Sequence, residues 1–180
     1  MRMGQPKAAL ALSDGTPFGG YLLSMLARCT DQQVVVGHGV GVTLQDDMVR
    51  IQDLAENAGP LSGIAALLGS GYGDRYLIVP CDMALLFEGL LRKLITTGSR
   101  SAVFKYPDGS IGPLPCVIHS ECAEIAVAHL HSADRSLRSF IGAINPAFCP
   151  VDPTDTDALR GCNTPQEYAA LYGETRSGQE

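Results

Sequence analysis

The clearest strand signal in the chain is Tyr76-Leu77-Ile78-Val79-Pro80-Cys81, and Asp82 follows it directly. Short runs rich in aromatic and β-branched residues are typical of strands that are buried on both faces of a sheet. Helical patterns lie on either side of this run, over 61–68 and 85–96. We therefore predict a buried strand between two helices, with Asp82 at its carboxyl end.

The first half of the chain continues this alternation of strands and helices. Shorter apolar runs predict strands over 33–37 and 49–52. A helix is expected over 17–29, with Thr16 as its N-cap and a proline at its first position. Such an alternation predicts an α/β protein, with a mostly parallel sheet and helices on both faces.

The second half of the chain is more mixed. Pro107-Asp108-Gly109 is a turn signal, and the apolar runs on either side of it, 101–106 and 114–118, predict a hairpin. Helices are expected to follow over 121–131 and 136–141.

Length and composition limit the classes of protein that fit. The chain has 180 residues, of which 46% are hydrophobic, so we expect one domain over 1–172 and a disordered polar tail over 173–180. A net charge of -6 argues against nucleic-acid binding, which usually needs a basic surface. The chain has no apolar run of about 18 residues and no signal-peptide pattern, so we expect a cytoplasmic protein without a membrane span.

Two cations and a glycine lie close together at the start of the chain, in Arg2-Met3-Gly4-Gln5-Pro6-Lys7. Such a loop can wrap the phosphates of a nucleotide, because Gly4 lets the backbone approach closely while Arg2 and Lys7 neutralise charge. A charged N-terminus is also often simply a solvated end. The phosphate-binding interpretation therefore depends on the rest of the chain.

Two carboxylates follow predicted strands at the end where open α/β sheets bind ligands, namely Asp53 and Asp82. A carboxylate in this place suits Mg²⁺, which takes one or two protein oxygens and otherwise binds water and phosphate. Either residue can also have a purely local role, because Asp often caps a helix or stabilises a turn.

Residues 56–63, Glu-Asn-Ala-Gly-Pro-Leu-Ser-Gly, lead into the helix predicted over 61–68. Gly59 and Gly63 allow a flat ligand or a backbone to approach closely, and the helix start offers unpaired N–H groups. The segment is a candidate ligand-binding loop, although an ordinary helix start would look similar.

Four short motifs occur in this order along the chain: Arg2-Met3-Gly4-x-x-Lys7, Gly59-Pro60-Leu61-Ser62-Gly63, Pro80-Cys81-Asp82-Met83 and Asn163-Thr164-Pro165. Their order and spacing resemble those of the molybdenum cofactor guanylyltransferases, and the resemblance extends from residue 2 to about residue 172. It implies a nucleotidyltransferase with a Rossmann-like fold.

The reaction that this resemblance implies is transfer of GMP from GTP. The terminal phosphate of Mo-molybdopterin attacks the α-phosphorus of Mg-GTP, and pyrophosphate leaves. By the same resemblance, Arg2, Gly4 and Lys7 would hold the triphosphate, with Arg2 and Lys7 stabilising charge on the leaving pyrophosphate. Asp82 would hold the Mg²⁺ and is, with Arg2 and Lys7, one of the three catalytic residues.

The remaining family motifs would bind the nucleoside and the acceptor. Asp53 and the loop at Gly59 and Pro60 would seat the guanosine, and Asn163 would lie near the pterin. The implied partners are GTP, Mo-molybdopterin and other molybdenum cofactor proteins.

Alternative substrates fit many of the same residues. A related family uses CTP for the same cofactor, although the Gly59-Pro60-Leu61 loop is more similar to the guanylyl branch. A nucleotidyltransferase for a sugar phosphate would use the same phosphate-binding residues.

The sequence also departs from the family pattern. Family members begin with a strand and a Gly-Gly loop ahead of Arg-Met-Gly, and this sequence has neither. Gly37, Ala84 and Gly161 stand where relatives carry Asn, Pro and Asn. Two hypotheses follow: the chain is the truncated form of a longer active enzyme, or it is a non-catalytic relative that acts as a binding partner.

Overall fold

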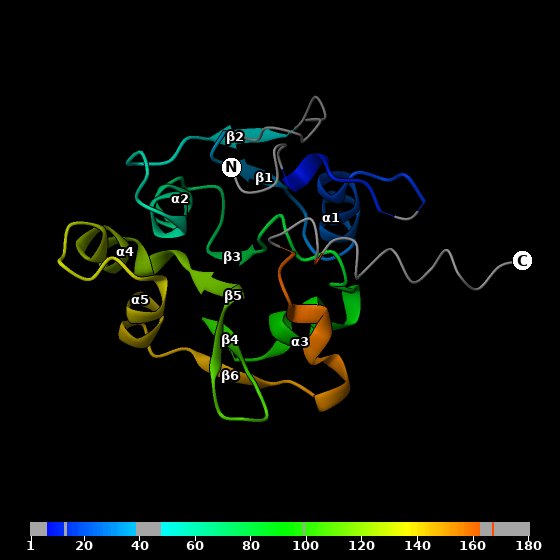
Figure 1. The fold of residues 1–180 in the computed structure, drawn as a ribbon. Helices are drawn as coiled ribbons and strands as arrows, with labels where there is room; N and C mark the ends of the chain where they lie inside the picture. The colour runs from blue at the N-terminus through cyan, green and yellow to red at the C-terminus, as the bar shows by residue number, and fades with distance from the viewer. Residues whose placement is uncertain (1–6, 13, 39–47, 99, 163–166, 168–180) are drawn as a thin grey trace, which may run out of the picture.

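The computed structural model of the protein describes residues 7–12, 14–38, 48–98, 100–162 and 167. Figure 1 shows a stack of strands with helices around it. The strands are β1 (Val34–Val36), β2 (Val49–Ile51), β3 (Arg75–Ile78), β4 (Ala102–Lys105), β5 (Ile111–His119) and β6 (Ala147–Pro150). The helices are α1 (Phe18–Ala27), α2 (Pro60–Leu68), α3 (Glu88–Thr96), α4 (Ala123–Leu130) and α5 (Leu137–Ala143), with 3₁₀ segments η1 (Lys7–Ala9), η2 (Ser120–Cys122) and η3 (Pro153–Leu159).

The strands of the described residues form two hydrogen-bonded groups, β1-β2 and β3-β5-β4-β6. The β1–β2 and β4–β6 pairs are parallel, whereas β5 runs antiparallel to both β3 and β4. The sheet is therefore mixed, because the predicted β4–β5 hairpin places an antiparallel strand between strands that run the other way.

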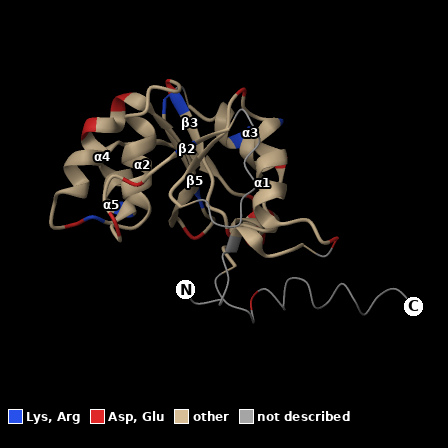
Figure 2. Cartoon of the chain, turned by 90° about the horizontal axis from the view of Figure 1, so that it is seen from above, with Lys and Arg blue, Asp and Glu red and all other residues tan. Residues whose placement is uncertain are grey.

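Helices cover both faces of the strands, with α1 and α3 on one side and α2, α4 and α5 on the other (Figure 2). The strand β4 shows how the side chains divide between these layers. Phe104 packs in the core beneath α3 with Leu90 and Leu94, whereas its neighbour Val103 packs with Leu61 and other buried residues on the opposite face. Side chains that alternate between two buried layers are typical of a strand that is covered on both faces. The strands with helices on both faces (Figure 2) confirm the predicted α/β class.

Several boundaries differ from the sequence prediction. The strand β3 starts at Arg75 and ends at Ile78, two residues before Pro80, which cannot donate a ladder hydrogen bond. The predicted N-cap Thr16 is wrong: Pro17 occupies the N-cap of α1, and the Thr16 N–H bonds to Asp14 Oδ1 at 2.8 Å.

The strand β6 has no counterpart in the prediction. It pairs with β4 from more than 40 residues further along the chain, and it ends in a proline.

None of the helices in the described residues is long and apolar enough to cross a lipid bilayer. The predicted tail over 173–180 lies outside the described residues.

Candidate functional site

Three of the segments predicted to form the site meet around a small buried cluster. The cluster comprises Leu10, Phe18, Ala84 and Cys162. Leu10 directly follows η1, which begins at the predicted phosphate-binding residue 7, and Ala84 lies two residues after Asp82. Residues from the start, the middle and the end of the chain are thus brought together at one place.

A backbone hydrogen bond connects two of these segments directly. The N–H of Cys162 donates to the backbone oxygen of Asp82 at 2.7 Å. Cys162 immediately precedes the predicted site residue Asn163, which itself lies outside the described residues. Cys162 therefore adjoins the third motif in the fold, although it is 80 residues away from Asp82 in the sequence.

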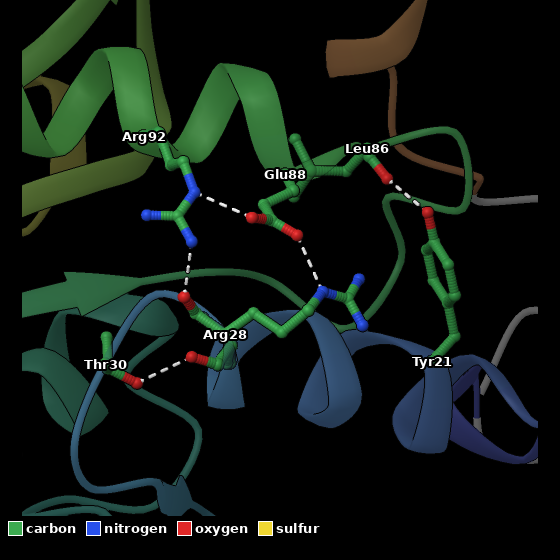
Figure 3. A network of polar contacts seen from close by, with 7 residues as sticks. Tyr21, Arg28, Thr30, Leu86, Glu88 and Arg92 are labelled. Carbon is green, nitrogen blue, oxygen red and sulfur yellow. Dashed lines mark hydrogen bonds and ion pairs between the residues drawn. The ribbon is translucent and has the colours of Figure 1, made fainter.

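The Asp82 loop is anchored by buried side chains on the chain that follows it. Asp82 itself is half-buried, whereas Met83 and Leu86 lie in the core with α3. The Tyr21 hydroxyl of α1 donates to the Leu86 backbone oxygen at 2.8 Å, as Figure 3 shows. These contacts anchor the backbone of the loop that carries Asp82 on the core.

A charged network holds the start of α3 against α1 (Figure 3). The Glu88 carboxylate accepts from Arg28 Nε at 2.6 Å and from Arg92 Nε at 2.7 Å. Arg92 also donates from Nη2 to the Arg28 backbone oxygen at 2.7 Å. The hydrogen bond from Arg28, followed by that from Arg92, holds the pKa of Glu88 below its usual value. The network fixes the helix that begins just after the Asp82 loop.

Asp53 lies in a separate part of the structure, at the carboxyl end of β2. Its carboxylate packs between two glycines: a Cβ on Gly37 would lie 3.3 Å from Oδ2, and a Cβ on Gly63 would lie 2.8 Å from Oδ1. The Gly63 position would also be 2.8 Å from Val36 Cγ1. Real side chains do not tolerate that distance, so glycine at 63 lets α2 approach β1 and Asp53 closely.

Ser62 is a positioning residue that we did not predict. Its side chain is 1% exposed, and its Oγ accepts from the Ala55 N–H at 2.7 Å and donates to the Ala55 oxygen at 2.9 Å. It ties the chain after Asp53 to the first turn of α2. A serine in the first turn of a helix is a recognisable signal for such local bonding, but the sequence does not show which backbone groups it binds.

The loop before α2 has the backbone geometry that its glycines predict. Gly59 is the N-cap of α2 with a φ of 72°, and Pro60 occupies the first turn. Both are exposed, as is Asp53. The Asp53 carboxylate and the start of α2 thus form an accessible surface at the end of β1 and β2.

The structure leaves part of the predicted site without a description. Arg2, Gly4 and Asn163 lie outside the described residues, and only the backbone of Lys7 is described. Within the described part of the chain, no group of three or more His, Cys, Asp or Glu side chains could hold a metal ion. Asp82 fits Mg²⁺ without such a group, because this ion takes one or two carboxylates and completes its shell with water and phosphate.

Comparison with known proteins places the chain in a family. Residues 1–147 match the family model described as MobA-like NTP transferase domain. A probable molybdenum cofactor guanylyltransferase of Methanothermobacter thermautotrophicus is 31% identical over 180 residues, covering 92% of this chain and 90% of the relative. A molybdenum cofactor biosynthesis bifunctional protein of Synechocystis is 25% identical over 175 residues, and the chain spans 50% of its length.

Solved structures agree with this fold. Molybdopterin-guanine dinucleotide biosynthesis protein A from Archaeoglobus fulgidus superposes with a TM-score of 0.68 at 14% identity, covering 97% of this chain and 93% of that one. At this identity the likeness supports the Rossmann-like nucleotidyltransferase fold.

Proposed function

The chain belongs to the family of molybdenum cofactor guanylyltransferases, and on that premise we propose that it transfers GMP from GTP to the terminal phosphate of Mo-molybdopterin. The observation that best supports a working site is the meeting of the Lys7, Asp82 and Cys162 segments around one buried cluster. Described residues next to three of the four motifs meet at this cluster, which supports substrate groups being bound near one another.

The proposed reaction needs no covalent intermediate on the protein. An oxygen of the molybdopterin phosphate forms a bond to the α-phosphorus of GTP, while the bond between that phosphorus and the bridging oxygen to the β-phosphate breaks. Pyrophosphate leaves with the bonding electrons. The protein would accelerate this step by positioning the two substrates and by neutralising charge on the phosphates.

The phosphate groups would be held by the start of the chain. Arg2 and Lys7 would bind the triphosphate and stabilise charge on pyrophosphate as it departs, and Gly4 would let the backbone approach the phosphates closely. Asp82 would hold Mg²⁺ in this arrangement. Enzymes of this family typically use that ion, which neutralises phosphate charge and favours departure of the leaving group.

The guanosine would lie against the surface at the end of β1 and β2. Gly59 and Pro60 expose the backbone of the loop before α2, and the Asp53 carboxylate, which packs against Gly63 in the same helix, can accept hydrogen bonds from a ribose hydroxyl or a base N–H. Asn163 would contact the pterin substrate, since it follows the Cys162 backbone that bonds to Asp82.

We propose that residues 1–172 fold as one domain, that the protein works in the cytoplasm, and that it meets other molybdenum cofactor proteins when it receives or delivers its substrate.

A panel of substrates tests this assignment. The chain is incubated with Mg²⁺ and either GTP or CTP, with Mo-molybdopterin or a sugar phosphate as acceptor, and released pyrophosphate is measured. We expect pyrophosphate with the pair GTP and Mo-molybdopterin. Faster release with CTP, or with a sugar phosphate in place of Mo-molybdopterin, would overturn the proposal.

A further inference from the structure

An aromatic side chain is exposed on β6, the last strand of the described sheet (Figure 1). Phe148 is 46% exposed, although it pairs in register with Val103, whose side chain is buried. Register partners point to the same face of a sheet, so Phe148 lies on the face that packs against α2, α4 and α5. The helices on this face cover Val103 but leave Phe148 largely open to solvent.

A small cavity of about 90 Å³ lies beside Phe148. Ile111 of β5 and Ile141 of α5 line it together with Phe148, so its walls are mostly apolar. A cavity of about 150 Å³ is large enough to bind benzene. This cavity is smaller, and a branched aliphatic side chain such as that of leucine fits it better than an aromatic ring.

Two cations border the cavity, and neither has a carboxylate partner among the described residues. Arg138 of α5 lines it, and Lys105 Nζ lies 5.4 Å from the centroid of the Phe148 ring. Other described cations, in contrast, each pair with an Asp or a Glu: Arg28, Arg92, Lys93, Arg100 and Arg160. In a chain with a net charge of -6, two unpaired cations at one place are complementary to an acidic ligand.

The acidic residues closest along the chain to these two cations bond to their own turns. Asp108 Oδ1 accepts from the Ser110 N–H at 2.8 Å and from the Ser110 hydroxyl at 2.6 Å. Asp134 accepts a backbone hydrogen bond at 2.9 Å in the loop before α5. The charges of Lys105 and Arg138 therefore remain available to a ligand.

Prolines disfavour the addition of a further strand to β6. The N–H groups of Ala147 and Val151 donate to backbone oxygens on the β4 side at 2.8 Å and 3.0 Å. Backbone groups alternate from side to side along a strand, so positions 146, 148 and 150 face outward. Pro146 and Pro150 have no N–H, which leaves Phe148 with the one outward N–H of this segment. A ligand on this surface would consequently be held mainly by side chains.

We propose that this surface, the Phe148 patch, binds an acidic segment of a partner protein that carries one leucine-sized aliphatic residue. The patch comprises Lys105, Ile111, Arg138, Ile141 and Phe148. The aliphatic side chain would fill the cavity, and carboxylates on either side of it would pair with Lys105 and Arg138. A symmetric contact between two copies of this chain is disfavoured, because it would bring the same cations of both copies together.

A labelled acidic peptide tests the proposal. The probe is Glu-Glu-Leu-Glu-Glu, blocked at both ends and carrying a fluorophore, and its binding to the full chain is followed by fluorescence anisotropy at low ionic strength. We expect saturable binding that weakens as salt is added. A peptide with glycine in place of leucine keeps the charge and should bind at least about fivefold more weakly, because it buries less apolar surface. Absence of binding, or equal binding of the two peptides, would overturn the proposal.

Substitutions of exposed cations separate the patch from general attraction of an anion. Arg138→Gln and Lys105→Gln should each weaken binding of the leucine peptide about threefold. The matched control is Arg50→Gln: Arg50 is exposed on β2, in the other group of strands, and forms no ion pair within the described residues. It removes the same charge and should change the affinity much less. An equal effect of all three substitutions would contradict the proposal.

Methyl NMR locates the peptide on the unaltered protein, so the test holds even if a variant fails to fold. We expect the leucine peptide to shift the methyl signals of Ile111 and Ile141, which line the cavity. Ile64 of α2 lies in the core and should not shift. Unchanged signals of Ile111 and Ile141 would overturn the proposal. So would a dimer in sedimentation experiments that dissociates in Phe148→Ser, since it would assign the patch to a second copy of the chain.

Discussion

Lys7 is the residue on which the proposed charge neutralisation depends most. Replacing a cation that contacts the leaving group removes an interaction that strengthens in the transition state. We expect Lys7→Ala to lower the turnover number at least about a hundredfold, without loss of the folded state. The measurement is steady-state release of pyrophosphate from GTP.

The matched control for this variant is Lys93→Ala. Lys93 lies on α3 and pairs with the exposed Asp152 at 3.1 Å, away from the motif segments. Its removal should leave turnover nearly unchanged. An effect of Lys7→Ala below about fivefold would remove Lys7 from the mechanism.

Asp82 is expected to show its role through Mg²⁺. Asp82→Asn keeps the size of the side chain but removes the negative charge that favours the ion. We expect lower turnover and a higher Mg²⁺ concentration at half-maximal rate, measured by titrating Mg²⁺ at fixed GTP. Asp157→Asn is the control, since Asp157 is exposed and pairs only with Arg160 among the described residues. An unchanged Mg²⁺ dependence for Asp82→Asn would contradict the assignment.

Some single-residue features of the site can be predicted from the sequence, and others cannot. The strand signal before Asp82 predicts β3 from local pattern alone, but β3 ends at Ile78, so Asp82 lies in a turn four residues beyond the strand and not directly after it. The contact between Asp53, Gly37 and Gly63 depends on how α2 packs against β1, and no local pattern contains that information. The same holds for the bond from Cys162 to Asp82, which joins distant parts of the chain.

The close packing of α2 against β1 and Asp53 depends on the absence of a side chain at position 63. Gly63→Ala would place a Cβ 2.8 Å from both Asp53 Oδ1 and Val36 Cγ1, so either α2 or Asp53 must move. We expect this variant to lower the melting temperature and to raise the KM for GTP, because the proposed guanosine surface is displaced.

Gly142→Ala is the control for this helix substitution. Gly142 lies in α5, and nothing lies within 4 Å of the position of an added Cβ. Alanine favours a helix over glycine, so Gly142→Ala should keep or slightly raise the melting temperature. If Gly63→Ala and Gly142→Ala change the melting temperature equally, the close approach at Gly63 does not contribute to stability.

The Glu88 network between α1 and α3 predicts a dependence of stability on pH. The pKa of Glu88 is lowered in the fold, so its contribution is fully present above its ordinary value of 4.5 and is lost as pH falls through the lowered value. We expect the difference in melting temperature between wild type and Glu88→Gln to be small at pH 7 and to disappear in acid.

The control for the Glu88 variant is Glu124→Gln. Glu124 is exposed on α4 and forms no ion pair within the described residues. Its substitution should leave the melting temperature nearly constant at every pH. A difference for Glu88→Gln that does not diminish in acid would contradict the role of its charge.

The class of most elements could be predicted from sequence, but their ends and some partners could not. The hairpin of β4 and β5 follows from two apolar runs around a turn, and α2 follows from the Gly59-Pro60 start. In contrast, β6 is four residues long and ends in a proline, and its pairing with β4 is decided by the tertiary fold. Short edge strands of this kind carry little local signal.

At the level of the whole molecule, the order of the strands could not be predicted from the sequence. The sequence contains β1 and β3, yet only their positions in the fold show that, among the described residues, β1 pairs with β2 and β3 pairs with β5.

The central claim, that this chain moves GMP onto Mo-molybdopterin, is tested most directly by following the phosphorus atoms. The chain is incubated with Mg²⁺, Mo-molybdopterin and GTP labelled at either the α- or the γ-phosphate, and the products are separated. We predict that the α-label appears in a molybdopterin–guanine dinucleotide and the γ-label in pyrophosphate. Transfer of the γ-label to the acceptor, or no dinucleotide at all, would contradict the account.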